Sequence, residues 1–438
     1  MKTQITNILP RSSMLLRKPT ICFVIALCIM GAVDVDTIVA AGKPMIYVPS
    51  DYADIYDAVY RADDTPSTIV LAPDTYLLDM GRGPFNGALR LKSGDNLVSS
   101  LELELDEDGV PLDPTDAVLE TGAIINISPL TWYYDEEPAV QGRNCTIRGL
   151  TVLCDTPPSW PGTRPPGIEI TSADDGRLSR GEIIGCVAIN TGRGFTVNVS
   201  PGGRTHGIIR QCVARRNYHG GQVVSGGDYR DHYGVEVSDT RIRASVERSR
   251  WEGNFMGFTI MANLNGQRND VDVSTNDNVF RDNLWWAVQY FMGANGWLDP
   301  PLSEVEGVIG SWTSRSDLFE ENGQAVYLSG FAGGNFKDCH LTMSLLHPTF
   351  RRLLAEGAEP FVDVRDEPHY WSAGDGTEGA TIEVLVRGAE GGKFWVNRPG
   401  STDVVGVEVI LLGTEQAWES ANDWSVPPDT GNALWSGL

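Results

Sequence analysis

The sequence predicts an all-β solenoid of short parallel strands, on three observations. Apolar runs that flank a polar turn recur along the chain, at Cys186–Val197, Cys212–Val224, Trp251–Ile260, Val279–Gln289 and Leu318–Leu328, with a degenerate sixth copy opening at Phe336. The Asn of each turn recurs at an irregular period of roughly 30 residues, which is typical of a solenoid whose loops vary on one face. The runs are short and rich in β-branched residues, which favours strands over a helical solenoid.

The repeated Asn residues are expected to occupy equivalent turns of successive rungs. A tight turn needs left-handed backbone, which Asn tolerates, and its side-chain amide can hydrogen-bond along the stack. The residues concerned are Asn190, Asn217, Asn254, Asn283 and Asn322. Cys186 and Cys212 hold the same place in consecutive units, so we expect them to be vertical neighbours in the core.

The N-terminal part adds a helix and two strands before the repeats. Tyr52–Arg61 has apolar residues at helical spacing, and the strand-like segments Thr68–Leu77 and Leu89–Val98 follow. This order resembles the opening of right-handed parallel β-helix proteins of the pectate-lyase-like superfamily, over roughly Met45–Leu346. The resemblance implies that the helix caps the open end of the stack, where strand edges would otherwise be unpaired. It transfers no catalytic signature residue by residue.

The chain begins with features of an export signal. Basic residues between Lys2 and Lys18 precede an apolar run, Ile21–Val33, and then Val39–Ala41. We therefore expect residues 1–41 to be a signal peptide, 42–346 a β-helix, and 347–438 final irregular rungs and a C-terminal cap. The protein would be secreted, periplasmic or at the cell surface; the alternative is a retained N-terminal anchor.

Charge and cysteine content limit the partners. The net charge is −24, and removing residues 1–41 makes it more negative, which disfavours nucleic acid and anionic membranes as partners. Five Cys remain after residue 41, without a CxxC motif, so we expect core thiols; a Cys145–Cys154 bond is the alternative. The acidic stretch Leu101–Asp116 lacks the spacing of a Ca²⁺ loop, so it predicts a solvated insertion. We expect no cofactor; Ca²⁺ is the alternative, and no sequence motif indicates it.

Chemistry in a solenoid is expected in the excursions between repeats. These follow the strand after each Asn turn, at Ser200–His206, Ser225–Tyr233, Ala262–Asp270, Met292–Asp299 and Ser329–Lys337. Because they share a rung position, their polar residues should align on one edge. The candidate catalytic residues are His206, Arg230, Asp231, His232, Arg268 and Asp270. The candidate substrate-binding residues are Arg204, Tyr229, Tyr233, Trp297 and Asp299. Solvated turns of similar composition are the competing interpretation.

Two reaction types fit these residues. No Lys lies between Lys92 and Lys337, so Arg would neutralise a sugar carboxylate while His or Tyr removes the neighbouring proton. Alternatively, Asp231 and Asp270 would act as the carboxylate pair of a glycoside hydrolase.

The leading hypothesis is an exported carbohydrate-active enzyme, of lyase or glycosidase type, that binds a polysaccharide along the side of the helix. A sugar-polymer epimerase or intramolecular transferase is the second hypothesis, and a non-catalytic adhesin or glycan-binding protein is the third. The expected partner is a glycan, with no nucleic acid and no membrane after signal removal. The oligomeric state stays open.

Overall fold

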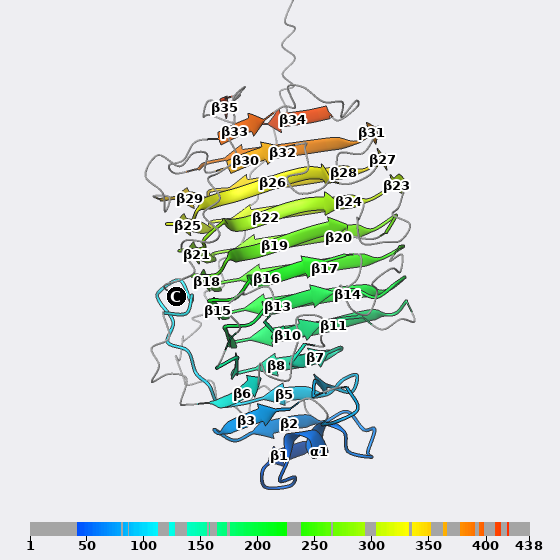
Figure 1. Ribbon diagram of the computed structural model, residues 1–438, viewed down its shortest axis with the longest axis vertical. Helices are drawn as coiled ribbons and strands as arrows, with labels where there is room; N and C mark the ends of the chain where they lie inside the picture. The colour runs from blue at the N-terminus through cyan, green and yellow to red at the C-terminus, as the bar shows by residue number, and fades with distance from the viewer. Residues whose placement is uncertain are drawn as a thin grey trace, which may run out of the picture. The chain divides into compact units, whose positions relative to one another are not determined.

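The computed structural model describes residues 42–79, 82–85, 87–112, 122–127, 138–155, 157, 164–172, 176–225, 238–263, 266–293, 304–332, 335–351, 362–365, 377–389, 394–397, 408–412 and 418–419. They belong to one compact unit, 41–438. Three long parallel sheets, which we name A, B and C, supply one strand each to most rungs of a stack (Figure 1). The predicted all-β parallel β-helix is therefore confirmed.

The strands are given in their order along each sheet. Sheet A comprises β1 (Met45–Val48), β2 (Thr68–Leu71), β5 (Asn96–Val98), β8 (Cys145–Arg148), β11 (Leu178–Ile184), β14 (Arg204–Arg210), β17 (Arg241–Glu247), β20 (Asp270–Asn276), β24 (Ile309–Arg315), β28 (His340–Leu346), β32 (Thr381–Arg387) and β34 (Glu408–Leu412). Sheet B comprises β3 (Thr75–Leu78), β6 (Ala123–Ile127), β9 (Leu150–Leu153), β12 (Val187–Ile189), β15 (Val213–Arg215), β18 (Arg250–Glu252), β21 (Val279–Arg281), β25 (Leu318–Glu320) and β29 (Thr349–Phe350). Sheet C comprises β4 (Leu89–Arg90), β7 (Val140–Gly142), β10 (Ile168–Ile170), β13 (Arg193–Asn198), β16 (His219–Val224), β19 (Met256–Asn263), β22 (Trp286–Gly293), β26 (Gln324–Ala332), β30 (Val362–Arg365), β33 (Phe394–Asn397) and β35 (Trp418–Glu419). A fourth, short sheet holds β23 (Glu304–Glu306), β27 (Asn335–Lys337) and β31 (Thr377–Glu378).

The core lies between the three sheets, where inward side chains stack rung on rung. Along β17 and β20 most inward positions are apolar, as at Val246 and Val273, which are fully buried. Phe280 and Phe319 continue the stack with ring centroids 5.2 Å apart and nearly parallel planes. This spacing follows from strands about 4.8 Å apart, so each rung buries its apolar face only against its neighbours.

The corner between sheets B and C contains a buried ladder of Asn side chains. The Asn217 backbone N–H and side-chain amide donate to Asn254 Oδ1 at 3.0 and 3.1 Å, and Asn254 and Asn283 make the same contacts one rung further on. Four of the five predicted Asn residues thus occupy equivalent places. Asn190 is the exception: it takes the left-handed position before the ladder, and Thr191 donates to Asn217 in its stead.

The corner between sheets A and B holds a second buried stack. Cys186 and Cys212 occupy equivalent places in it, as predicted. Ser249, Asn278 and Asp317 follow on the next rungs, each accepting from the backbone N–H below. All five cysteines after residue 41 are free thiols, so the alternative Cys145–Cys154 bond does not form.

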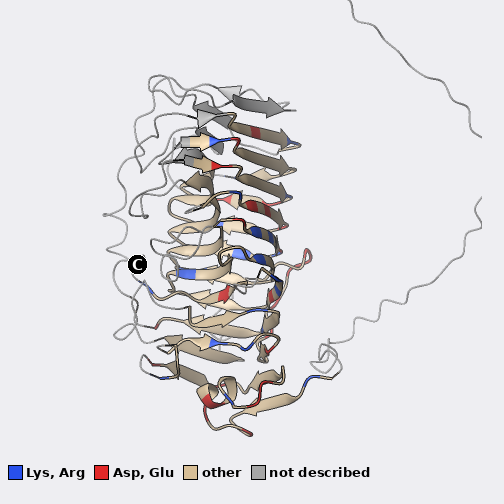
Figure 2. Cartoon of the chain, turned by 90° about the vertical axis from the view of Figure 1, so that its right-hand side faces the viewer, with Lys and Arg blue, Asp and Glu red and all other residues tan. Residues whose placement is uncertain are grey.

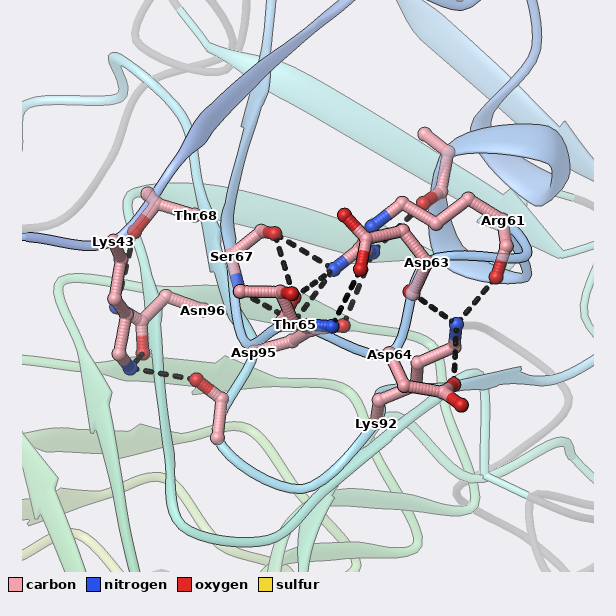
Figure 3. Close-up of polar contacts among 12 residues, drawn as sticks. Lys43, Arg61, Asp63, Asp64, Thr65, Ser67, Thr68, Lys92, Asp95 and Asn96 are labelled. Atoms are coloured by element: carbon pink, nitrogen blue, oxygen red, sulfur yellow. Dashed lines mark hydrogen bonds and ion pairs between the residues drawn. The ribbon is translucent and has the colours of Figure 1, made fainter.

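The predicted helix is present but shorter than expected. Helix α1 (Ile55–Val59) lies beside β1 at the blue end of the stack (Figure 1), and Asp54 caps it by accepting from the Tyr56 N–H. After the helix, Arg61 and Asp95 form a buried ion pair, with Nη2 and Oδ1 2.9 Å apart (Figure 3). The Ser67 N–H and hydroxyl complete this network, which fastens the helix to the first rungs.

The acidic insertion is not wholly solvated. Within its described part, up to Leu112, Leu101 and Leu103 pack against Val187 and Val213 of sheet B. Arg250 Nε donates to the Pro111 carbonyl at 3.2 Å. Apolar residues among the carboxylates, at Leu101 and Leu103, explain why the segment packs on the sheet.

Candidate functional site

The outer face of sheet A carries charged side chains in fixed columns. Strands β11, β14, β17 and β20 are seven residues long and pair in parallel without a register break. Because side chains alternate between the two faces of a strand, the first and third residues of each point outward from the core. Figure 2 faces this side of the stack and shows blue bands on neighbouring strands, with red bands on the strand above them.

Two columns make up this surface, which we name the charged face. In the first column Arg204, Arg241 and Asp270 are register partners on successive strands. In the second column the partners are Arg180, His206, Arg243 and Asp272. The four Arg residues and Asp272 are exposed, while His206 and Asp270 are partly exposed.

Ion pairs connect the strands at one edge of the charged face. Arg241 Nε lies 3.0 Å from Asp270 Oδ2, with both side chains about half exposed. In the corner just before these strands, Arg268 makes a two-point contact with Asp239, at 2.7 and 2.8 Å. Hydrogen bonding from Arg268 lowers the pKa of Asp239 below its usual value. Both pairs join the same two rungs: in the first the Arg is on the β17 rung and the Asp on the β20 rung, and in the second this order is reversed.

The structure places the predicted site residues in three groups. Arg204, His206 and Asp270 lie on the charged face, where register brings them within one or two strands of one another. Arg268 lies in the corner beside it, paired with Asp239. The remaining candidates lie outside the described residues: Tyr229, Arg230, Asp231, His232, Tyr233, Trp297 and Asp299.

Sequence reasoning missed the other members of the charged face, namely Arg180, Arg241, Arg243 and Asp272. Each stands two residues from, or in register with, a residue that was proposed. The signal was present as charged residues at alternate positions of a strand, in Arg241-Ile-Arg243 and Asp270-Val-Asp272. Such alternation places both charges on one face of the sheet.

The charged face is chemically equipped to bind a carboxylate and move a proton. Guanidinium groups bind carboxylates through paired hydrogen bonds, and imidazole is the side chain best suited to proton transfer near neutral pH. His206 has Arg204 two residues away on its own strand, and Arg180 and Arg243 beside it on the neighbouring strands. Among the residues described, no group of His, Cys, Asp and Glu could hold a metal ion.

Two buried ionisable groups elsewhere in the described part, His219 and Asp317, have hydrogen-bond partners within the core. Burial, with a further effect of Arg193, lowers the pKa of His219 to about 3, and its Nδ1 lies 2.7 Å from Thr259 Oγ1. Burial raises the pKa of Asp317 to about 6, although four hydrogen bonds from Thr275, Asn278 and Ser314 oppose the rise. Neither group reaches a surface where a substrate could bind.

A scan against protein-family models finds no match, and a search of curated proteins finds none either. Similar solved structures include the A-modules of two Azotobacter vinelandii mannuronan C-5 epimerases. The AlgE4 module is 14% identical, covers 84% of this chain and 94% of its own, and has a TM-score of 0.38. The AlgE6 module is 13% identical, covers 85% of this chain and 94% of its own, and has a TM-score of 0.41. The catalytic domain of a GH87 alpha-1,3-glucanase in complex with nigerose is 9% identical, covers 84% of this chain and 68% of its own, and has a TM-score of 0.30.

Proposed function

We propose that this protein is an exported enzyme that transfers a proton on an acidic polysaccharide bound over the charged face. The observation that carries the proposal is the position of His206, with Arg204, Arg180 and Arg243 around it in register. A single imidazole among guanidinium groups suits a uronic acid, whose carboxylate needs neutralising and whose neighbouring carbon bears the proton to be removed. Export is the expectation from residues 1–41. Within the described ranges, no helix is both long and apolar enough to cross a membrane.

The reaction begins with removal of the C5 proton by His206. The C–H electron pair moves into the carboxylate system as an enolate, whose added charge the Arg residues stabilise. In elimination, that pair forms the C4–C5 double bond, the C4–O bond breaks, and the leaving oxygen takes a proton. In epimerisation, a proton from solvent adds to C5 from the opposite face, the proton on His206 returns to solvent, and no glycosidic bond breaks. Both outcomes share the first step.

Hydrolysis is a second candidate, supported by Asp270 and Asp272. Two residues apart on one strand, they have Cα atoms roughly 6.6 Å apart, close to the separation of about 6.5–9.5 Å between the carboxyl groups of inverting glycosidases. Asp270, however, already forms an ion pair with Arg241. This contact commits one of the two carboxylates to the protein itself, so proton transfer by His206 is the stronger candidate.

The test is incubation with polymannuronate, polyguluronate, polygalacturonate and heparosan in D2O. New absorbance at 235 nm reports elimination, deuterium at C5 without chain cleavage reports epimerisation, and new reducing ends without an unsaturated product report hydrolysis. Binding without any product supports the non-catalytic glycan-binding hypothesis instead.

The decisive variant is His206→Gln, with His340→Gln as its control. His340 is also exposed on sheet A, on β28, but it is the register partner of Ile309 and lies two strands beyond Asp270, away from the Arg residues. We expect His206→Gln to lower turnover by about 100-fold or more, as loss of a general base does, with an unchanged melting temperature. Near-full turnover by His206→Gln would reject this residue as the base.

A further inference from the structure

The charge of the charged face changes sign across a single rung. Strand β17 presents Arg241 and Arg243, and β20 presents Asp270 and Asp272 at the same two register positions. On the far side of β20, the partners on β24 are uncharged: Ile309 and Ser311. A polymer lying along the stack therefore passes from an Arg-rich half to an acidic row and then to a neutral one.

The two Asp side chains are not equivalent. Asp270 is held by Arg241 at 3.0 Å, so this pair has no net charge. Asp272 is exposed, in the column that also holds His206 and Arg243. It is two strands from His206, or about 10 Å at 4.8 Å per rung, which is near the length of two linked sugar rings. Asp272 thus faces a neighbouring sugar and not the one that reacts.

We infer that Asp272 is a specificity-determining residue that admits an uncharged sugar over β20 and rejects a uronate there. This inference rests on the proposed function, since it assumes a uronate beside His206. A carboxylate over β20 meets a like charge, whereas hydroxyl and amide groups of a neutral sugar donate hydrogen bonds to it. Ile309, 48% exposed beside this row, offers an apolar contact for the ring. The substrate is accordingly a heteropolymer of uronate and neutral sugars and not a homopolyuronate.

The experiment compares each polyuronate of the panel with a partially carboxyl-reduced form, in which some uronates have become neutral sugars on the same backbone. Affinity electrophoresis measures binding by the wild type, Asp272→Asn and the control Glu383→Gln. Glu383 belongs to the same column but lies three strands beyond Asp272. We expect the wild type to bind the partially reduced polymer more tightly. Asp272→Asn should strengthen binding of the fully charged polymer by about fivefold, the repulsion of two charges in contact in water, and Glu383→Gln should not.

The outcomes separate this inference from the proposed function. If the wild type prefers the fully charged polymer, or if Asp272→Asn leaves the preference unchanged, the role of Asp272 is refuted while a role of His206 stands. If no polyuronate, native or reduced, binds the wild type, the proposed function fails and the inference fails with it. Fully carboxyl-reduced polymer should bind weakly, because it offers nothing to Arg180, Arg204 and Arg243.

Discussion

Replacing Asn254 by Ala tests whether the buried ladder holds the rungs together. The Asn254 side chain makes four hydrogen bonds: its Oδ1 accepts from the N–H and the side-chain amide of Asn217, and its Nδ2 donates to the Ala214 carbonyl and to Asn283 Oδ1. Alanine leaves the fully buried Asn217 N–H without its acceptor, which costs about 1–3 kcal/mol. The other lost bonds add to this, so we expect a total of about 3–5 kcal/mol.

The matched control is Thr191→Val at the end of the same ladder. It removes only the bond from the Thr191 hydroxyl to Asn217 Oδ1, because the Thr191 backbone N–H still donates there. A cost of about 1 kcal/mol is expected. Urea unfolding followed by circular dichroism gives both values, and hydrogen exchange shows whether the rungs around β18 and β21 open locally. If Asn254→Ala costs no more than Thr191→Val, the ladder is not the stabilising element inferred here.

Two further predictions concern buried carboxylates. In the folded chain, burial raises the pKa of Asp317 from its ordinary value of 3.8 to about 6. The stability that protonated Asp317 contributes is therefore fully present below pH 3.8 and is lost as the pH rises through 6. The free energy of unfolding should fall by about 3 kcal/mol over this pH range. Asp317→Asn should reduce the change in urea midpoint between pH 4 and 7, and a pH profile identical to that of the wild type would contradict this cause. Asp95→Ala, which leaves the Arg61 charge buried and unpaired, should cost about 3–5 kcal/mol. The exposed pair of Arg268 and Asp239 is its control, since Asp239→Ala should cost under about 1 kcal/mol; equal melting temperatures of the two variants would refute the distinction.

The stacked fold was predictable because every rung repeats the same local requirements: a short apolar run, a turn and another run. The ladder position was harder to assign, since Asn serves two neighbouring positions of the turn. At Asn190 it supplies left-handed backbone, a role that Arg216 and Gly253 take on later rungs. At Asn217 it supplies the buried amide. Asn is compatible with both roles, and the residues stacked on the neighbouring rungs determine which role each Asn has.

The site was predicted in part, and the reason is geometric. Attention to the excursions found Arg204, His206 and Asp270 because they stand where an excursion meets a strand of sheet A. The other charged residues hold the same first and third strand positions but lie outside those excursions. Arg180 precedes the first excursion, Arg241 and Arg243 follow the end of Ser225–Tyr233, and Asp272 lies two residues beyond Asp270. Register could not be predicted because excursion lengths vary, so nothing in the sequence aligned Arg243 with His206 across 37 residues of chain.

The same geometry separates stability from function in this molecule. Buried stacks at the two ends of the sheet B strands, through Asn254 and Asn278, join each rung to its neighbour, and the Asn278 stack does so at the corner next to sheet A. The outward side chains of the charged face contribute little to that fixation, because exposed ion pairs are worth at most about 1 kcal/mol. Arg243 and His206 are therefore held at rung spacing by contacts made elsewhere, which is the preorganisation that charge stabilisation requires. A substitution that loosens the corner beside β17 should then weaken substrate binding, although it changes no side chain that contacts the substrate. A substitution on the charged face should change substrate binding and leave the free energy of unfolding unaffected.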